Sequence, residues 1–164
     1  MVGKTYAELG GSHYYQNRGF LGNSVPKVRM EQAKKTMDQI TEAIDKGYLR
    51  SCHDLSEGGL AVASAEMAFS SGHGIELDLK KVPRTKETCR NDFVLFSESN
   101  SRFLVEVTEK RRTDFEALMK DIDCAEIGKV KKDGILSVTG LDGEQKIHAD
   151  LEELRRRWKS VLGA

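Results

Sequence analysis

With 164 residues, the chain is long enough to form one domain with a real hydrophobic core. Its apolar fraction of 38% and charged fraction of 32% are typical of a water-soluble globular protein. The formal net charge is zero, so overall charge does not draw the protein to nucleic acid or to an anionic membrane.

The sequence contains no run approaching the roughly 18 apolar residues of a membrane span, and its first residues lack the apolar core of a signal peptide. The cysteines Cys52, Cys89 and Cys124 are odd in number and lack CxxC spacing. This pattern favours free thiols in a reducing compartment. We therefore expect a cytoplasmic protein with neither a nucleic-acid nor a membrane partner.

The first half of the chain predicts a loop, two helices and two strands. Residues 1–26, rich in Gly, Asn and aromatic residues, predict a long ordered loop. Apolar residues then recur at helical spacing up to Gly47, a suitable C-terminal cap. A short strand is expected over residues 48–53, an Ala-rich helix over 58–70, and a strand with one buried face over 75–79.

The second half predicts more strands and two more helices. The continuous apolar run 93–96 is consistent with a strand buried on both faces. Strands are expected over 102–107, 125–130 and 135–141 and around 146–148, with a helix over 109–121. Asp-Gly pairs at 133–134 and 142–143 are turn signals of the kind found in hairpins.

The last helix and the fold class complete the prediction. Asp150 and Glu153 form a capping-box-like start for a final helix. Its expected apolar stripe consists of Leu151, Leu154, Trp158 and Val161. We expect residues 1–164 to form a single α/β (α+β) domain, with a mixed sheet covered by helices.

Two motifs that could carry chemistry are rejected on the residues themselves. "VGKT" at residues 2–5 resembles the end of a phosphate-binding P-loop, but that motif needs an earlier glycine, a preceding strand and a following helix, and this sequence does not contain the upstream part. Cys52, His53 and Asp54 offer three metal-ligand types side by side. Neighbours on a strand point to opposite faces, and no second cluster supplies further ligands, so we predict no metal site.

The stretch "CHDLSEGGL" at residues 52–60 is the strongest candidate site. Two interpretations remain open. Ser56 or Asp54 could cap the following helix while Glu57 faces its positive end. Alternatively, the glycines allow close approach of a ligand, and the acids select hydroxyls, amines or a phosphate that arrives with Mg²⁺. The candidate binding residues here are Asp54, Ser56, Glu57, Gly58 and Gly59.

Two further polar stretches are candidates for the same site. In "ELGGSHYY", Gly10, Gly11 and Ser12 could present N–H groups and a hydroxyl, or could allow a tight chain crossing. "FSESNSRF" places six polar residues between two expected strands where a hairpin would carry Gly or Asn-Gly. Its polar side chains could therefore face a cleft; they are Ser97, Glu98, Ser99, Asn100 and Arg102.

Three segments together carry a family resemblance: "GKTYAELGGSHYY", "HDLSEGGLAVASAEMAF" and "LFSESNSRFLVEV". Their order and spacing resemble the C-terminal domain of the large subunit of phosphoribosylformylglycinamidine synthase, in the aminoimidazole ribonucleotide synthetase superfamily. The resemblance extends through "IGKV" at residues 127–130 and the last helix. It implies that this chain is part of a longer enzyme in which ATP-binding N-terminal halves alternate with C-terminal halves.

The resemblance also implies an activity, cofactors and partners. The family's ATP-dependent ligase converts formylglycinamide ribonucleotide and glutamine-derived ammonia to an amidine in purine biosynthesis. ATP and Mg²⁺ are implied for the intact enzyme, with most nucleotide contacts in the N-terminal halves. The implied partners are those halves and the glutaminase and small subunits. The chain alone is then expected to be inactive and to self-associate, most simply as a dimer, through apolar surface left exposed.

The sequence departs from the family pattern in two places. Glu98-Ser99-Asn100 stands where the family's substrate-holding motif is Glu-Ser-Gln, so the amide lies about 1.5 Å further back, one C–C bond. His13 stands where an acid is common, and we assign it no catalytic role. A structural or interaction domain of the same enzyme therefore remains an alternative. So does the equivalent domain of thiamine-monophosphate kinase, selenophosphate synthetase or the hydrogenase-maturation dehydratase.

Overall fold

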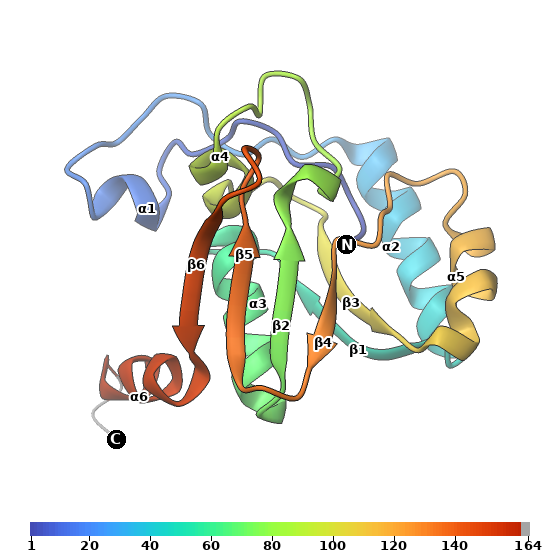
Figure 1. Cartoon of the computed structure of the whole chain (residues 1–164). Helices are drawn as coiled ribbons and strands as arrows, with labels where there is room; N and C mark the ends of the chain where they lie inside the picture. The colour runs from blue at the N-terminus through green and yellow to red at the C-terminus, as the bar shows by residue number, and fades with distance from the viewer. Residues whose placement is uncertain (162–164) are drawn as a thin grey trace.

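The computed structural model describes residues 1–161, arranged as a mixed α/β fold (Figure 1). The expected loop of residues 1–26 is mostly irregular but includes one helical turn, α1. The α-helices are α1 (His13–Gln16), α2 (Met30–Asp45), α3 (Gly59–Ser71), α4 (Asn91–Phe96), α5 (Arg112–Leu118) and α6 (Leu151–Val161). The strands are β1 (Leu49–Asp54), β2 (Gly74–Asp78), β3 (Phe103–Val107), β4 (Gly128–Lys131), β5 (Ile135–Thr139) and β6 (Gln145–Asp150).

The strands form two sheets. β1 and β3 make an antiparallel pair, and the other four strands form a mixed sheet in the order β4-β2-β5-β6. Within that sheet only β2 and β5 run parallel, with Ile75 opposite Leu136 and Leu77 opposite Val138. The mixed sheet that the sequence predicts is therefore present.

One of the two expected hairpins is not formed. Asp133-Gly134 makes the turn between β4 and β5, but β2 lies between these two strands and pairs with both. The second turn, Asp142-Gly143, joins β5 and β6, which do pair as antiparallel neighbours. A local turn signal specifies the reversal of the chain, whereas strand neighbours depend on where the apolar faces are buried.

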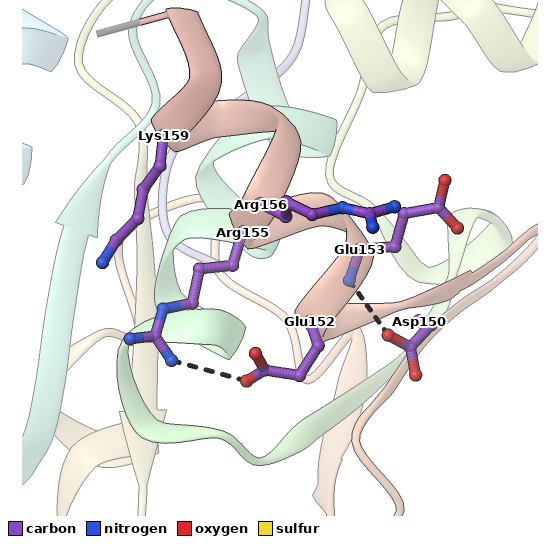
Figure 2. A pocket seen from close by; sticks show the side chains of 6 residues that line it. All are labelled: Asp150, Glu152, Glu153, Arg155, Arg156 and Lys159. Carbon is purple, nitrogen blue, oxygen red and sulfur yellow. Dashed lines mark hydrogen bonds and ion pairs between the residues drawn. The ribbon is translucent and has the colours of Figure 1, made fainter. Parts of the chain in front are cut away.

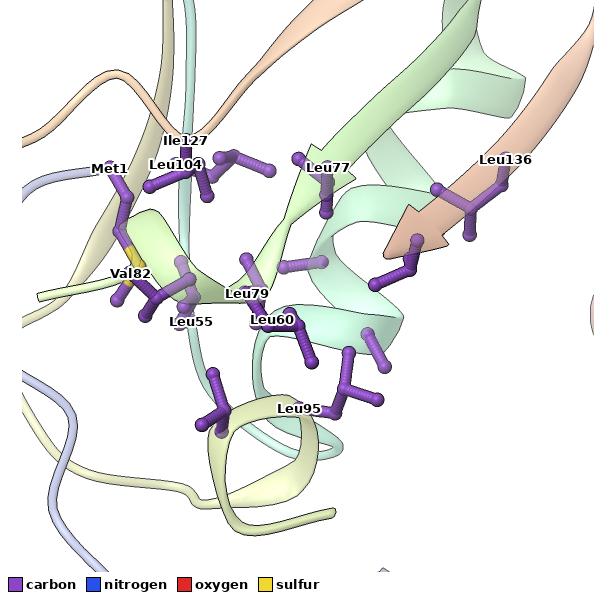
Figure 3. Packing of buried hydrophobic residues seen from close by; sticks show 14 of the residues in the cluster. Met1, Leu55, Leu60, Leu77, Leu79, Val82, Leu95, Leu104, Ile127 and Leu136 are labelled. Atoms are coloured by element: carbon purple, nitrogen blue, oxygen red, sulfur yellow. The ribbon is translucent and has the colours of Figure 1, made fainter. Parts of the chain in front are cut away.

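Helix α3 forms the centre of the larger core. Its small residues allow close packing, and Leu60, Ala63 and Ala68 are almost completely buried. Leu77 and Leu136 come from the sheet, and Leu95 and Leu104 from α4 and β3 (Figure 3). A second, smaller core lies between α2, α5 and the β1–β3 pair, and includes Ile40 and Phe115.

The apolar run at residues 93–96 is a helix, not the strand that the sequence analysis expects. It forms most of α4, in which Val94 and Leu95 are buried and Phe93 and Phe96 are half-buried. A run of four apolar residues fits a buried strand or a buried helix equally well. Here α4 packs against α3 rather than joining a sheet.

The last helix follows the prediction. The Glu153 N–H donates to Asp150 Oδ1 at 3.0 Å, as expected for a cap. Leu151 is buried, Leu154 is half-buried, and the Trp158 ring lies 5.7 Å from Phe69. Val161 was expected to complete the apolar stripe, but its side chain lies outside the described part of the chain.

Candidate functional site

The three polar segments singled out in the sequence meet in the structure, around the start of α3 and the end of α4. The Glu8 N–H donates to Ser97 Oγ at 3.3 Å, and the Glu98 N–H donates to the Glu8 carbonyl at 3.2 Å. The Tyr6 N–H donates to Ser99 Oγ at 3.1 Å. Residues 6–8 and 97–99 therefore lie side by side although some ninety positions separate them in the sequence.

The glycine pair is joined to this cluster by Glu98. The Gly58 N–H donates to Glu98 Oε1 at 2.9 Å, which places a carboxylate at the positive end of α3. Gly58 and Gly59 both have positive φ, at 75° and 59°. A Cβ on Gly59 would lie 2.5 Å from the Ser97 carbonyl oxygen and 2.8 Å from that of Leu95. The close approach that Gly59 permits is therefore to the protein's own backbone, whereas a Cβ on Gly58 would meet the Val62 side chain.

The two acids beside the glycine pair, Asp54 and Glu57, face outward and do not cap α3. Asp54 is exposed and accepts a hydrogen bond from Ser56, while Glu57 Oε2 lies 3.3 Å from His13 Nε2. Helix α3 begins after Gly58 with no side-chain cap and no acid in its first turn. Of the two interpretations left open, capping of α3 by Ser56 or Asp54 is therefore wrong, and the carboxylate near the start of α3 is Glu98, from a distant part of the chain.

Arg102 is buried rather than facing a cleft. Its guanidinium is 1% exposed and donates to the Ser97 carbonyl at 2.5 Å, the Ser99 carbonyl at 2.8 Å and Thr5 Oγ1 at 3.1 Å. Burial lowers the pKa of Arg102 to about 10, while the charges of Glu8 and Glu98 oppose that shift, so the group is still charged at neutral pH. It holds the 97–102 loop in a fixed shape.

Glu8 is a site residue that the sequence analysis did not single out. Its side chain is buried, with Oε1 3.0 Å from Arg29 Nη2 and Oε2 without a hydrogen-bond partner in the described structure. The Arg29 guanidinium in turn stacks on the Tyr6 ring at 3.3 Å. The only signal in the sequence was an acid directly before the Leu9-Gly10-Gly11 stretch.

The N–H groups of the first glycine loop are used within the chain. Gly10 and Gly11 donate to the carbonyls of Ser24 and Leu21 at 2.8 and 2.7 Å. The Ser12 hydroxyl donates to the Leu9 carbonyl at 2.7 Å and accepts from the Tyr15 N–H at 3.3 Å, so Ser12 caps α1. These contacts favour the tight chain crossing, one of the two interpretations left open above.

The candidate residues divide by exposure into an outer rim and a buried support. The exposed ones are Gly11, Asp54, Ser56, Glu57 and Asn100. Gly10, Ser12, Gly58, Gly59 and Ser99 are buried, and Glu98 is half-buried. The next residue, Ser101, has a φ of 60°, unusual for a residue with a side chain, and this turn leads into β3. The rim can offer carboxylates and amides to a ligand, held by the buried hydrogen bonds below it.

Two surface pockets lie away from the rim. One of about 580 Å³ lies along α6 and is formed by charged side chains, including Glu152 and its partner Arg155 (Figure 2). Another, of about 480 Å³, lies between Tyr14, Asp92 and Leu141. Neither contains a residue of the rim.

Residues 1–161 contain no group of three His, Cys, Asp or Glu side chains suitable for a metal ion. Within the same range, no helix combines the length and apolar character needed to span a lipid bilayer.

Comparison with known proteins places this chain in a family. The sequence profile described as "AIR synthase related protein, C-terminal domain" matches residues 1–140. The chain belongs to this family of AIR synthase-related C-terminal domains.

Among curated proteins, the chain is 38% identical over 164 residues to the phosphoribosylformylglycinamidine synthase subunit PurL of Thermococcus kodakarensis. It is 33% identical over 165 residues to the PurL of Moorella thermoacetica. Each match covers 99% of this chain but only 22% and 21% of the relative. The chain thus spans about a fifth of the length of these relatives.

Solved structures support the fold. A Thermotoga maritima PurL complexed with FGAR superposes with a TM-score of 0.78 at 17% identity, over 93% of this chain and 26% of that one. The hydrogenase maturation protein HypE in complex with ATP gives a TM-score of 0.62 at 18% identity, over 94% of this chain and 50% of that one. The identity with HypE is too low to carry more than the fold.

Proposed function

We propose that this chain serves as a domain of a phosphoribosylformylglycinamidine synthase, the ATP-dependent ligase that amidates formylglycinamide ribonucleotide in purine biosynthesis. The observation that carries the proposal is the 38% identity to a PurL subunit across 99% of the chain. The meeting of the three segments that carry the resemblance supports it, since a shared site constrains all three together.

In this proposal the chain contributes a rigid rim rather than the reacting groups. Arg102 and Glu98 hold the buried support, and Asp54, Glu57 and Asn100 face a neighbouring ATP-binding half across the rim. An interaction role and a ligand-facing role within the same enzyme both fit this geometry. The buried hydrogen bonds favour the first, because they leave few free N–H groups for a ligand.

ATP is the proposed nucleotide of the intact ligase, supported by the PurL structures determined with ATP and ADP. Mg²⁺ does not fit the residues described here, because Asp54 is engaged by Ser56 and Glu57 by His13, and no third ligand joins them. We therefore place any Mg²⁺ of the intact enzyme in its ATP-binding halves and derive no step through it.

The proposed partners are those halves together with glutaminase and small subunits, supported by the solved assembly named PurLQS from Thermotoga maritima. We also propose a cytoplasmic location, supported by the three free cysteines.

The test is a domain exchange. In the Thermococcus kodakarensis PurL, the segment that matches this chain is replaced by the chain itself, and amidine formation from formylglycinamide ribonucleotide, ATP and ammonia is measured. The control carries the corresponding HypE segment, which shares only the fold. We expect turnover with this chain and none with the HypE segment. A folded exchange protein that binds ATP but gives no amidine would contradict the proposal.

A further inference from the structure

Residues 9–28 form a long excursion that leaves the body of the protein at Glu8 and returns to it at Arg29. This segment contains α1 and then runs along the top of the view to α2 (Figure 1). Its two ends are close together, because Glu8 Oε1 lies 3.0 Å from Arg29 Nη2. The backbone of Glu8 also bonds directly to Ser97 and Glu98. Arg29 therefore contacts the residue that joins the excursion to the candidate site.

The Glu8 carboxylate is buried and incompletely paired. Its side chain is 5% exposed, and Oε2 has no hydrogen-bond partner in the described structure. A buried carboxylate is stable only when a positive charge compensates it. Two guanidinium groups supply that charge. Arg29 makes the ion pair, whereas the buried charge of Arg102 acts on Glu8 without an ion-pair contact among the described residues.

The Arg29 side chain is held in place on Glu8 by two further contacts. Its guanidinium carbon lies 3.3 Å from the centre of the Tyr6 ring, and Nη1 donates to the Lys27 carbonyl at 3.2 Å. The Tyr6 ring is fixed in turn, since its hydroxyl donates to Gln32 Oε1 at 3.1 Å. A planar guanidinium can bond a carboxylate and stack on an aromatic ring at once, which an ammonium group cannot. The ion pair is therefore preorganised.

Arg102 can hold residues 97–102 in shape because Arg29 compensates Glu8. The Arg102 guanidinium donates to two carbonyls of that loop and to Thr5, and these bonds do not use all of its N–H groups. Without Arg29, the Glu8 carboxylate would have Arg102 as its compensating charge. A carboxylate is a stronger acceptor for a guanidinium than a carbonyl is, so the new pair would form at the expense of the loop.

We propose that Arg29 is a positioning residue for the candidate site and acts through Glu8. By compensating that carboxylate, it leaves Arg102 bonded to the carbonyls of residues 97–102. Arg29 itself needs no contact with a ligand. If the ion pair served only to fasten the excursion of residues 9–28, its removal would leave the 97–102 loop unchanged.

Amide hydrogen exchange in the full chain tests the proposal. The Glu98 N–H donates to the Glu8 carbonyl and the Gly58 N–H donates to Glu98 Oε1, so these two amides report on the shape of the site. Arg29→Gln should speed exchange at both amides about tenfold, as expected when a local opening becomes easier. Exchange at Leu136, which lies in β5 of the large sheet, should not change.

The matched control is Arg18→Gln. It removes a guanidinium from the same excursion, one that lies 4.6 Å from the centre of the Tyr14 ring but makes no ion pair among the described residues. Exchange at Glu98 and Gly58 should therefore stay at the wild-type rate in this variant.

Two more variants test whether the charge of Glu8 is the cause. With Glu8→Gln and Arg29→Gln combined, no buried carboxylate needs compensation, so exchange at Glu98 should return to within about threefold of wild type. Arg29→Lys keeps the positive charge and loses the stacking, so its exchange should be slower than that of Arg29→Gln.

Four results would overturn the proposal. The first is wild-type exchange at Glu98 and Gly58 in Arg29→Gln. The second is an acceleration that is equally large at Leu136, since the ion pair would then contribute only to global stability. The third is a double variant that exchanges as fast as Arg29→Gln, and the fourth is an Arg29→Lys variant that does so.

The consequence for catalysis rests on the proposed function and is measured separately. In the domain-exchange PurL, Arg29→Gln should lower kcat/KM for amidine formation about fivefold relative to Arg18→Gln. Equal values in the two variants would count against a role for Arg29 in the site. An exchange protein that is inactive with the unchanged chain would contradict the proposed function alone, and hydrogen exchange would still decide the role of Arg29.

Discussion

Glu98 Oε1 accepts a hydrogen bond from the Gly58 N–H at 2.9 Å, across 40 positions of the sequence. The contact puts a negative charge at the N-terminus of α3, where the helix otherwise has no side-chain cap. It also explains why the loop of Gly58 and Gly59 can be flanked by acids, because the Gly58 N–H is already bonded to a carboxylate of the same chain.

Replacing Glu98 by Ala should lower the free energy of unfolding by about 1–2 kcal/mol, the usual contribution of a hydrogen bond to a charged group that is partly exposed. Glu98→Gln keeps an acceptor and should cost about half as much. Urea unfolding measures both. Glu57→Ala is the control, because that side chain is 78% exposed and should change stability by less than about 0.5 kcal/mol. Equal midpoints for Glu98→Ala and Glu57→Ala would show that the contact contributes nothing.

Gly59→Ala should destabilise the protein by about 3 kcal/mol or more, because its Cβ would meet two carbonyl oxygens in a left-handed backbone conformation. Gly11→Ala has a similar φ of 76° but open space around the Cβ, so only about 1–2 kcal/mol of backbone strain is expected. The comparison separates steric contact from conformational strain. If thermal unfolding shifts equally in both variants, the crowding at Gly59 has no energetic consequence.

Leu60→Asp should unfold the domain. Leu60 is completely buried in the core around α3, and an unpaired buried charge costs several kcal/mol. Val62→Asp on the same helix is the matched control, because this side chain is 37% exposed and its carboxylate can reach water. Circular dichroism and size-exclusion chromatography report both. A cooperative thermal transition of wild-type midpoint in Leu60→Asp would be incompatible with the described core.

Some helices and strands of this fold can be predicted from the sequence alone, and others cannot. Helix α3 and strand β2 were predictable, because an Ala-rich run and an apolar alternation are local patterns. The helical conformation of residues 93–96 was not predictable, since four apolar residues fit a buried helix as well as a buried strand. The position of β2 between β4 and β5 was also not predictable. The turn at Asp133-Gly134 is compatible with direct pairing of β4 and β5 and with a strand inserted between them.

The sequence analysis predicted which segments form the candidate site, but it did not predict the hydrogen bonds within the site. Three polar segments were expected to meet, and they do. That Glu98 would bond Gly58, and that Arg102 would be buried beneath Ser97 and Ser99, could not be read from the sequence. Both depend on contacts between distant positions that no local propensity encodes. The ligand-binding role of the candidate residues in these three segments stays a prediction.

Acid should weaken the contact between α1 and α4. The hydrogen bond from Arg90 lowers the pKa of Asp92 below its ordinary value, and Tyr14 also donates to this carboxylate at 3.3 Å. A carboxyl with a lowered pKa in the folded state stabilises the protein above its unfolded-state pKa of about 3.9, and this stabilisation is lost as pH falls through the folded pKa. Urea unfolding of wild type should therefore show a loss of stability below pH 4 that is smaller in Asp92→Asn.

Arg90→Gln is the companion variant for the acid experiment, because it removes the main cause of the lowered pKa at Asp92. It should reduce the same acid-dependent loss, and combining it with Asp92→Asn should add little. An Asp92→Asn curve that runs parallel to wild type between pH 2 and 6 would mean that this carboxylate titrates identically in the folded and unfolded chains.

The insertion of β2 between β4 and β5 has a consequence for how the protein is made. Both neighbours of β2 lie more than a quarter of the chain further on, so a nascent polypeptide emerging from the ribosome holds Ile75 and Leu77 with neither edge of their strand covered. If synthesis stops before β4 is complete, the intermediate exposes the apolar residues and unpaired edges of β2. Such an intermediate is prone to aggregate and is a substrate for chaperones or proteases. Synthesis of residues 128–150, which contain β4, β5 and β6, is the event that closes the large sheet.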